Sequence, residues 1–236
     1  MNKLEKIINQ TKGKHSDWQE KLDLYIHANW KPDEYDEEEF MKIITGMNDI
    51  FKDIADCFYK YGNFKDSWDD NYCRMNPFGQ HLLLKSIKTN DTFDFGIDLM
   101  DATIYLNCYL YHPENLKYAD DDYWELLLSL KQFGDFEFKQ NAGISSTEEK
   151  YFNGKKSNLF KLLRNYLIYE IDNINLPNDE RKYDLDLGWY EIKWKIDCPW
   201  EVLVGNACRA FKVLYKLNYQ LWKVSDVKNK KLINVY

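Results

Sequence analysis

The chain has 236 residues, of which 44% are hydrophobic and 30% charged, and its formal net charge is -7. This apolar content is sufficient for a folded core and excludes an intrinsically disordered chain. The acidic balance argues against a nucleic-acid-binding protein, because such proteins need a basic surface to neutralise phosphate groups.

The first third of the chain is predicted to be helical. Residues 3–9 and 16–30 have helical hydrophobic spacing, and six of the seven residues 33–39 are acidic. Acidic residues are favourable at a helix N-terminus, where the helix dipole is positive. Apolar residues then recur at steps of three and four over 40–62, which predicts the longest helix of this region.

The middle of the chain is also predicted to be helical, after an irregular stretch at 62–76. Asparagine followed by proline at 76–77 is typical of a helix start and predicts a helix to about residue 88. Apolar residues at helical spacing predict a second helix over 93–111. Three aspartates open a third predicted helix, which covers 120–133.

The last 100 residues mix the two periodicities. Helical spacing predicts helices at 157–172 and 198–221, whereas alternation of polar and apolar residues, the period of a strand, predicts short strands at 135–139, 183–196 and 232–236. We therefore expect a mainly α fold, with a small antiparallel β element in the C-terminal third.

A single globular domain over 1–236 is expected, because no linker rich in Gly, Pro or Ser divides the chain. If it has two lobes, the boundary is expected near 139–157, where the hydrophobic pattern lapses. No stretch approaches the ~20 apolar residues of a membrane span, and the N-terminus does not resemble a signal peptide. Five widely spaced cysteines indicate free thiols, so we expect a cytoplasmic protein.

Residue patterns typical of catalytic, metal-binding or nucleotide-binding sites are scarce in the sequence. The four histidines lack the spacing of a zinc site, and no nucleotide-binding or nucleophile motif occurs. We therefore predict no catalytic residue, no metal and no cofactor. One alternative remains open: Asp94, Asp98 and Asp101 would share a face of the predicted helix 93–111 and, with further carboxylates, bind a divalent metal in an enzyme.

Aromatic residues are abundant, with 8 Trp and 18 Tyr, and several lie among acidic residues. Carboxylates attract and hydrogen-bond a basic partner, while Tyr and Trp supply contact area and cation–π interactions. Acidic residues at helix starts and inward-facing aromatics are the competing explanation. On the first interpretation, the predicted partner-binding residues are Glu34, Tyr35, Asp36, Glu37, Glu38, Trp68, Asp69, Asp70, Asp121, Asp122 and Trp189.

Three segments of the chain carry a resemblance to a known class of proteins. They are LFKLLRNY at 159–166, GWYEIKW at 188–194 and AFKVLYKLNY at 210–219. In their general sequence character, these segments resemble immunity proteins of bacterial polymorphic-toxin systems. The resemblance implies a protein that binds a cognate toxin domain tightly and keeps it inactive.

We therefore predict a bacterial immunity protein that occludes a basic toxin domain with an acidic, aromatic-rich surface, without nucleic acid or membrane as partner. The first alternative is a phage-encoded anti-defence protein that binds a host immune effector or a signalling nucleotide. In that case, Lys155, Lys156 and Arg164 would hold the anion. The second alternative is the metal-dependent enzyme with the aspartate cluster.

Overall fold

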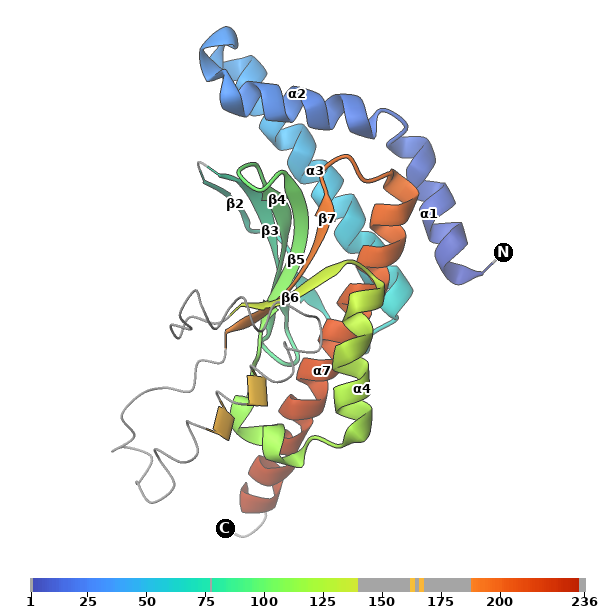
Figure 1. Cartoon of the computed structure of the whole chain (residues 1–236), viewed down its shortest axis with the longest axis vertical. Helices are drawn as coiled ribbons and strands as arrows, with labels where there is room; N and C mark the ends of the chain where they lie inside the picture. The colour runs from blue at the N-terminus through green and yellow to red at the C-terminus, as the bar shows by residue number, and fades with distance from the viewer. Residues whose placement is uncertain (1, 77, 140–161, 164–165, 168–187, 234–236) are drawn as a thin grey trace. The chain divides into compact units, whose positions relative to one another are not determined.

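The computed structural model describes residues 2–76, 78–139, 162–163, 166–167 and 188–233 (Figure 1). Its helices are α1 (Lys3–Lys14), α2 (Trp18–Trp30), α3 (Glu37–Gly62), α4 (Asp121–Ser129) and α7 (Trp200–Ile233), with short 3-10 turns η1 (Pro32–Glu34), η2 (Pro113–Tyr118) and η3 (Leu130–Gln132). Its strands are β1 (Trp68–Asp69), β2 (Cys73–Asn76), β3 (Gly79–Ser86), β4 (Thr92–Asp98), β5 (Thr103–Tyr109), β6 (Asp135–Lys139) and β7 (Trp189–Lys195).

The described strands form one antiparallel sheet of seven strands, in the order β1-β3-β4-β5-β7-β6, with β2 also paired to β3. The fold is therefore α/β, and the expected mainly α, all-helical class is wrong. The predicted C-terminal β element is present as β7, but it belongs to this larger sheet.

Two predicted helices, 77–88 and 93–111, are in fact the strands β3, β4 and β5. The side chain of Asn76 accepts a hydrogen bond from the backbone N–H of Phe78 at 2.8 Å, so Asn76 closes a turn between β2 and β3 and does not cap a helix. In β4, Phe93, Phe95 and Ile97 alternate inward, which is the period of a strand.

The N-terminal helices are confirmed, and their ends follow from local hydrogen bonds. Asn2 and Glu5 form a capping box at the start of α1. The carboxylate of Asp36 accepts the N–H of Glu39 at 2.8 Å and caps α3, while Asn63 in the left-handed conformation ends it. The acidic run thus stabilises the start of α3, as expected.

The chain divides into two compact units. Unit 1 comprises Met1–Asn107 and Lys193–Lys212, and unit 2 comprises Cys108–Ile192 and Val213–Tyr236. The single domain stays a prediction, and nearly all of the expected boundary at 139–157 lies outside the described residues.

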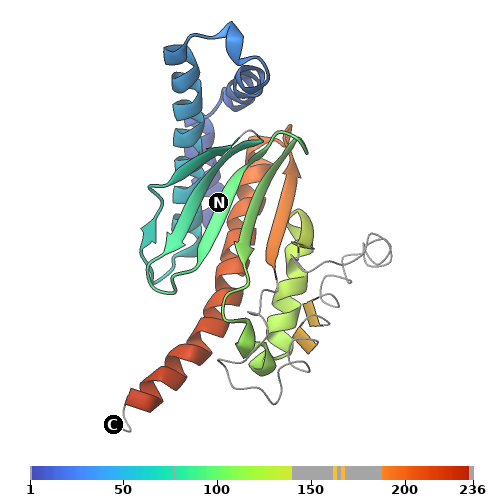
Figure 2. The same cartoon turned by 90° about the vertical axis from the view of Figure 1, so that its left-hand side faces the viewer.

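Unit 1 has an aromatic core between the helices and the sheet. Helix α3 packs against β3, and Figure 2 shows the strands in front of that helix. The ring of Phe58 stacks on that of Phe211 at 4.8 Å and meets Phe95 edge-on at 5.5 Å. Phe51 also meets Phe95 edge-on, so α3, β4 and the start of α7 share one core.

Unit 2 buries a second cluster. Tyr123 of α4 and Tyr190 of β7 are fully buried, with their hydroxyl groups 3.5 Å apart. Asn218 of α7 donates a hydrogen bond to the backbone carbonyl of Tyr109 at 3.0 Å. These contacts tie α4 and α7 to the strands of that unit.

The remaining expectations concern the last third of the chain. The helices at 120–133 and 198–221 and the strand at 135–139 are confirmed, although α7 continues to Ile233. The strand expected at 232–236 is therefore wrong for Leu232 and Ile233. The segment 183–187 and most of the helix 157–172 lie outside the described residues. None of the helices in the described part of the chain is long and apolar enough to cross a membrane.

Candidate protein-binding groove

An open groove of about 920 Å³ lies in unit 1 between α2 and α3. Its lining residues come from α2, from the connection through η1 and from the first half of α3: Lys21, Leu24, Glu34, Tyr35, Glu38, Glu39, Met41, Lys42, Ile43, Thr45, Gly46, Met47 and Asp49. From Glu38 to Asp49, α3 rises by about 16 Å, or three helical turns. The groove is therefore elongated along α3.

The end of the groove at η1 is fixed by contacts of His27. One ring nitrogen of His27, Nδ1, is hydrogen-bonded to the hydroxyl of Tyr35 at 2.8 Å, and Nε2 lies 3.5 Å from the carboxylate of Glu34. Lys31 forms an ion pair with Glu34 at 3.0 Å, and its hydrogen bond lowers the pKa of that carboxyl. At this end of the groove, Glu34 therefore presents a carboxylate, and Tyr35 presents a ring whose position is fixed by the hydrogen bond to His27.

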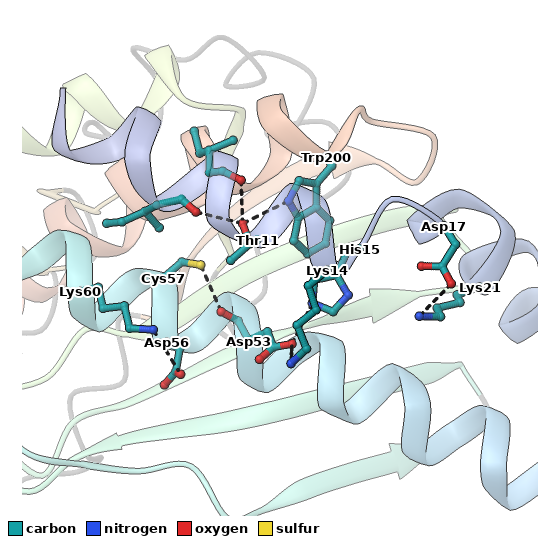
Figure 3. A network of polar contacts seen from close by, with 12 residues as sticks. Thr11, Lys14, His15, Asp17, Lys21, Asp53, Asp56, Cys57, Lys60 and Trp200 are labelled. Carbon is teal, nitrogen blue, oxygen red and sulfur yellow. Dashed lines mark hydrogen bonds and ion pairs between the residues drawn. The ribbon is translucent and has the colours of Figure 1, made fainter. Parts of the chain in front are cut away.

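A network on α1 holds α3 just beyond the groove (Figure 3). Lys14 and His15 point toward Asp53, and Nε2 of His15 lies 2.8 Å from its carboxylate. Burial alone would raise the pKa of Asp53, but the hydrogen bonds from Lys14 and His15 outweigh it and lower the pKa. Asp53 follows Asp49 by one helical turn, so these contacts position the far end of the groove.

The pKa of His15 moves in the opposite sense to that of a histidine in a simple ion pair. Burial lowers this pKa, and the hydrogen bond to Asp53 offsets only part of the effect. The ring also packs against the indole of Trp200, with centroids 4.8 Å apart. A neutral, packed imidazole therefore joins α1 to α3, and we assign it a structural role.

The groove has apolar side chains that remain exposed. Leu24 is 44% exposed and Met41 is 52% exposed, whereas Met47, which also lines the groove, is buried. Gly46 lies in the middle of α3, and a Cβ atom added there would meet nothing within 4 Å. Glycine in a helix interior costs about 1 kcal/mol relative to alanine. Among the described residues, no close neighbour explains why glycine is needed at this position. The absence of a side chain there deepens the groove.

The charge of the groove is predominantly negative. Glu34, Glu38, Glu39 and Asp49 contribute four carboxylates, against the two ammonium groups of Lys21 and Lys42. Lys21 is itself paired with Asp17 at 2.9 Å, and Glu34 is paired with Lys31 at 3.0 Å, which leaves three carboxylates and the ammonium group of Lys42. Three of the four carboxylates lie at the η1 end. This end would attract cationic groups, and the exposed leucine and methionine would bury apolar ones.

The structure brings only part of the predicted partner-binding residues to this groove. Glu34, Tyr35 and Glu38 line it, while Asp36 caps α3 beside it and Glu37 is exposed in the first turn. Acidic side chains and one aromatic side chain therefore lie together at the η1 end of the groove. Their binding role stays a prediction.

The second predicted cluster lies elsewhere in unit 1. Trp68 stacks on Tyr59 at 4.9 Å and packs against Phe93 and Phe211, so its half-buried ring lies at the edge of the core. Asp70 accepts a hydrogen bond from the hydroxyl of Tyr59 at 3.2 Å, and Asp69 is exposed on β1. Tyr59 lies about 15 Å beyond Asp49 along α3, so this cluster is remote from the groove.

The remaining predicted residues belong to unit 2. Asp121 and Asp122 are exposed in the first turn of α4, which Asp120 caps by accepting the N–H of Tyr123 at 3.0 Å. The helix dipole is sufficient reason for acids there. Trp189 of β7 is half-buried, and its ring lies 5.8 Å from that of Tyr109.

The alternative of a metal-dependent enzyme assumed a helix over 93–111, and that assumption is wrong. Asp94 and Asp98 lie on β4 and Asp101 on the turn after it, so they do not share a helix face. Asp98 accepts the N–H groups of Met100 and Asp101, and Asp101 pairs with Lys193 at 2.8 Å. Burial raises the pKa of Asp94 to about 6. Among the described residues, no group of three or more His, Cys, Asp or Glu has a metal-binding arrangement.

Lys155, Lys156 and Arg164, the predicted anion site, lie outside the described residues. Ten of the thirteen residues that line the groove were not predicted from the sequence, among them Leu24, Met41 and Gly46. A signal was present, because Gly46 interrupts a strong helical pattern and Leu24 lies off the apolar line of α2.

Comparison of the chain with protein-family models, with curated proteins and with solved structures found no match. The geometry of the groove and the sequence are therefore the features that bear on function.

Proposed function

We propose that this protein is a stoichiometric inhibitor that binds another protein, and that the groove between α2 and α3 receives a basic, partly apolar segment of its partner. The observation that carries the proposal is the composition of the groove. Exposed Leu24 and Met41 lie beside the carboxylates of Glu34, Glu38 and Glu39. Apolar anchors with a charged rim are typical of protein-binding sites.

The narrower form of the proposal is an immunity protein of a bacterial polymorphic-toxin system that neutralises a basic toxin domain. Two features support it. The segments at 159–166, 188–194 and 210–219 resemble such proteins in their general sequence character. The net charge of -7 would accelerate the encounter with a basic partner. Inhibition follows if the bound segment belongs to, or borders, the active site of the toxin.

Co-expression of the tagged protein with the product of the neighbouring gene tests the proposal. We expect a 1:1 complex that survives size-exclusion chromatography, and growth of cells that the neighbouring product alone would arrest. A neighbouring product that neither binds this protein nor is made harmless by it would overturn the proposed function.

A further inference from the structure

Three features of the groove bear on the shape of its occupant. The exposed residues of α3 that line it recur at steps of three and four in two neighbouring rows, which together form one stripe along the helix: Glu38, Met41, Thr45 and Asp49 in the first row, and Glu39, Lys42 and Gly46 in the second. This stripe faces the groove over three turns. An occupant that follows it would run alongside α2 and α3 over about the same length.

Gly46 is the second feature. It is exposed, it lies on this stripe beside Thr45, and the space around its missing side chain is open among the described residues. A glycine on a helix surface lets another backbone approach closely. The position therefore marks the closest approach between α3 and whatever fills the groove.

The third feature is the uneven charge. Glu34, Glu38 and Glu39 lie at the η1 end, where Lys31 pairs with Glu34 at 3.0 Å and Lys42 follows Glu38 by one turn. Lys21 lies on α2 about three turns away from that end, and Asp49 lies three turns along α3. Leu24 and Met41 supply apolar contact between the two ends. An occupant that matches this pattern has an apolar face and has lysine or arginine over the η1 end.

We propose that the occupant is an amphipathic α-helix of the partner, about three turns long, which packs its apolar face on Leu24 and Met41, crosses α3 at Gly46 and places basic residues over Glu34 and Glu38. This inference rests on the proposed function, because it names the part of the partner that the groove binds. It adds a third helix to the α2–α3 pair, in the helix-in-groove mode of recognition.

The walls of the groove favour a helix over an extended segment. Both walls are helices, whose backbone N–H and C=O groups are paired within each helix. An extended segment would find no strand edge here and would leave its own backbone groups unpaired against apolar side chains, which is costly. A helix satisfies its own backbone and needs only side-chain contacts.

Binding of two designed peptides of identical composition tests the inference. The first is a peptide of about 14 residues, half leucine and half lysine, with leucines at positions i, i+3, i+4, i+7, i+8, i+11 and i+12, which places them on one face of an amphipathic helix. The second alternates leucine and lysine, which favours a strand. Fluorescence anisotropy of each labelled peptide, titrated with the full chain, gives the dissociation constants.

The decisive variant is Gly46→Phe, which fills the groove at the proposed crossing point. Phenylalanine has a higher helix propensity than glycine, and the position is open, so α3 should remain intact. Gly13→Phe is the matched control, because Gly13 also has open space around it and does not line the groove. Circular dichroism of both variants verifies that the helices are retained.

We expect the helical peptide to bind at least about tenfold more tightly than its alternating isomer, Gly46→Phe to weaken it by about tenfold or more, and Gly13→Phe to have little effect. Equal binding of both peptides, or equal effects of both substitutions, would overturn the helical occupant. A complex with the neighbouring product alongside a negative peptide result would leave the inhibitor function standing. Binding of the helical peptide without a complex with the neighbouring product would overturn the proposed inhibitor function, while the groove would still be a site that binds a helix.

Discussion

At the scale of single residues, Asp91 is a buried carboxyl group of unit 1 whose ionisation is costly. It lies between β3 and β4 with no exposed surface. Burial raises its pKa to about 7; a contact with Thr89 opposes this shift, and the charge of Asp66 adds to it. Its folded pKa therefore exceeds the unfolded value of about 3.9. The folded state binds the proton more tightly, so stability is present at low pH and is lost as pH rises toward 7.

The substitution Asp91→Asn removes this titration. Relative to the unsubstituted protein, we expect the variant to gain about 2 kcal/mol in free energy of unfolding between about pH 5 and pH 8, because the cost of ionising a buried carboxyl disappears. Urea unfolding at several pH values measures the difference. Asp69→Asn, at an exposed position of β1, is the control. A stability difference for Asp91→Asn that does not change with pH would contradict this account.

At the scale of elements, two glycines of unit 1 have opposite roles. A Cβ atom on Gly96 of β4 would lie 2.6 Å from the backbone oxygen of Gln80 and 2.6 Å from the Cβ of His81, its partner on β3. The β3–β4 pair therefore requires glycine there because the strands approach closely. Gly46 on α3 has open space instead.

Alanine at these two positions should therefore change stability in opposite directions. We expect Gly96→Ala to destabilise the protein by about 2 kcal/mol through overpacking, and Gly46→Ala to stabilise it by about 1 kcal/mol through helix propensity. Thermal or urea unfolding of the two variants measures both effects. Similar shifts in the same direction would show that the environment of one glycine is wrong.

At the scale of the whole molecule, the net charge of -7 matters through where its carboxylates lie. The double substitution Glu38→Lys/Glu39→Lys reverses the charge of the groove. We expect it to slow association with the partner by about tenfold at low ionic strength and by much less in about 0.5 M salt. The reason is that salt screens the long-range electrostatic attraction that guides a basic partner to the groove. Stopped-flow or surface-based kinetics with the co-purified partner provides the rates.

The matched control for that prediction is Asp121→Lys/Asp122→Lys. Both pairs are exposed and lie in the first turn of a helix, so the change in net charge and the loss of favourable dipole interaction are the same. An equal loss of association rate in both double variants would assign the effect to net charge and not to the groove.

The sequence predicts the helices better than the sheet, and the reason is visible in residues 93–111. Phe95, Leu99 and Leu106 fit helical spacing, whereas Phe93, Phe95 and Ile97 fit the alternation of a strand. Both patterns coexist in the same residues. Pairing with β3, in the register of His81 opposite Gly96, selects the strand, and that partner is not visible in the local pattern.

The candidate site shows the same division. The sequence alone determined an acidic, aromatic-rich chain, the N-terminal helices and an acidic segment at the start of α3, because charge and helical spacing are local properties. Only the tertiary structure decided that Trp68 packs at the edge of the core, that Leu24 and Met41 stay exposed, and that Leu24 and Met41 line one groove with Glu34 and Glu38. Burial depends on which distant elements cover a side chain, and no local pattern encodes that.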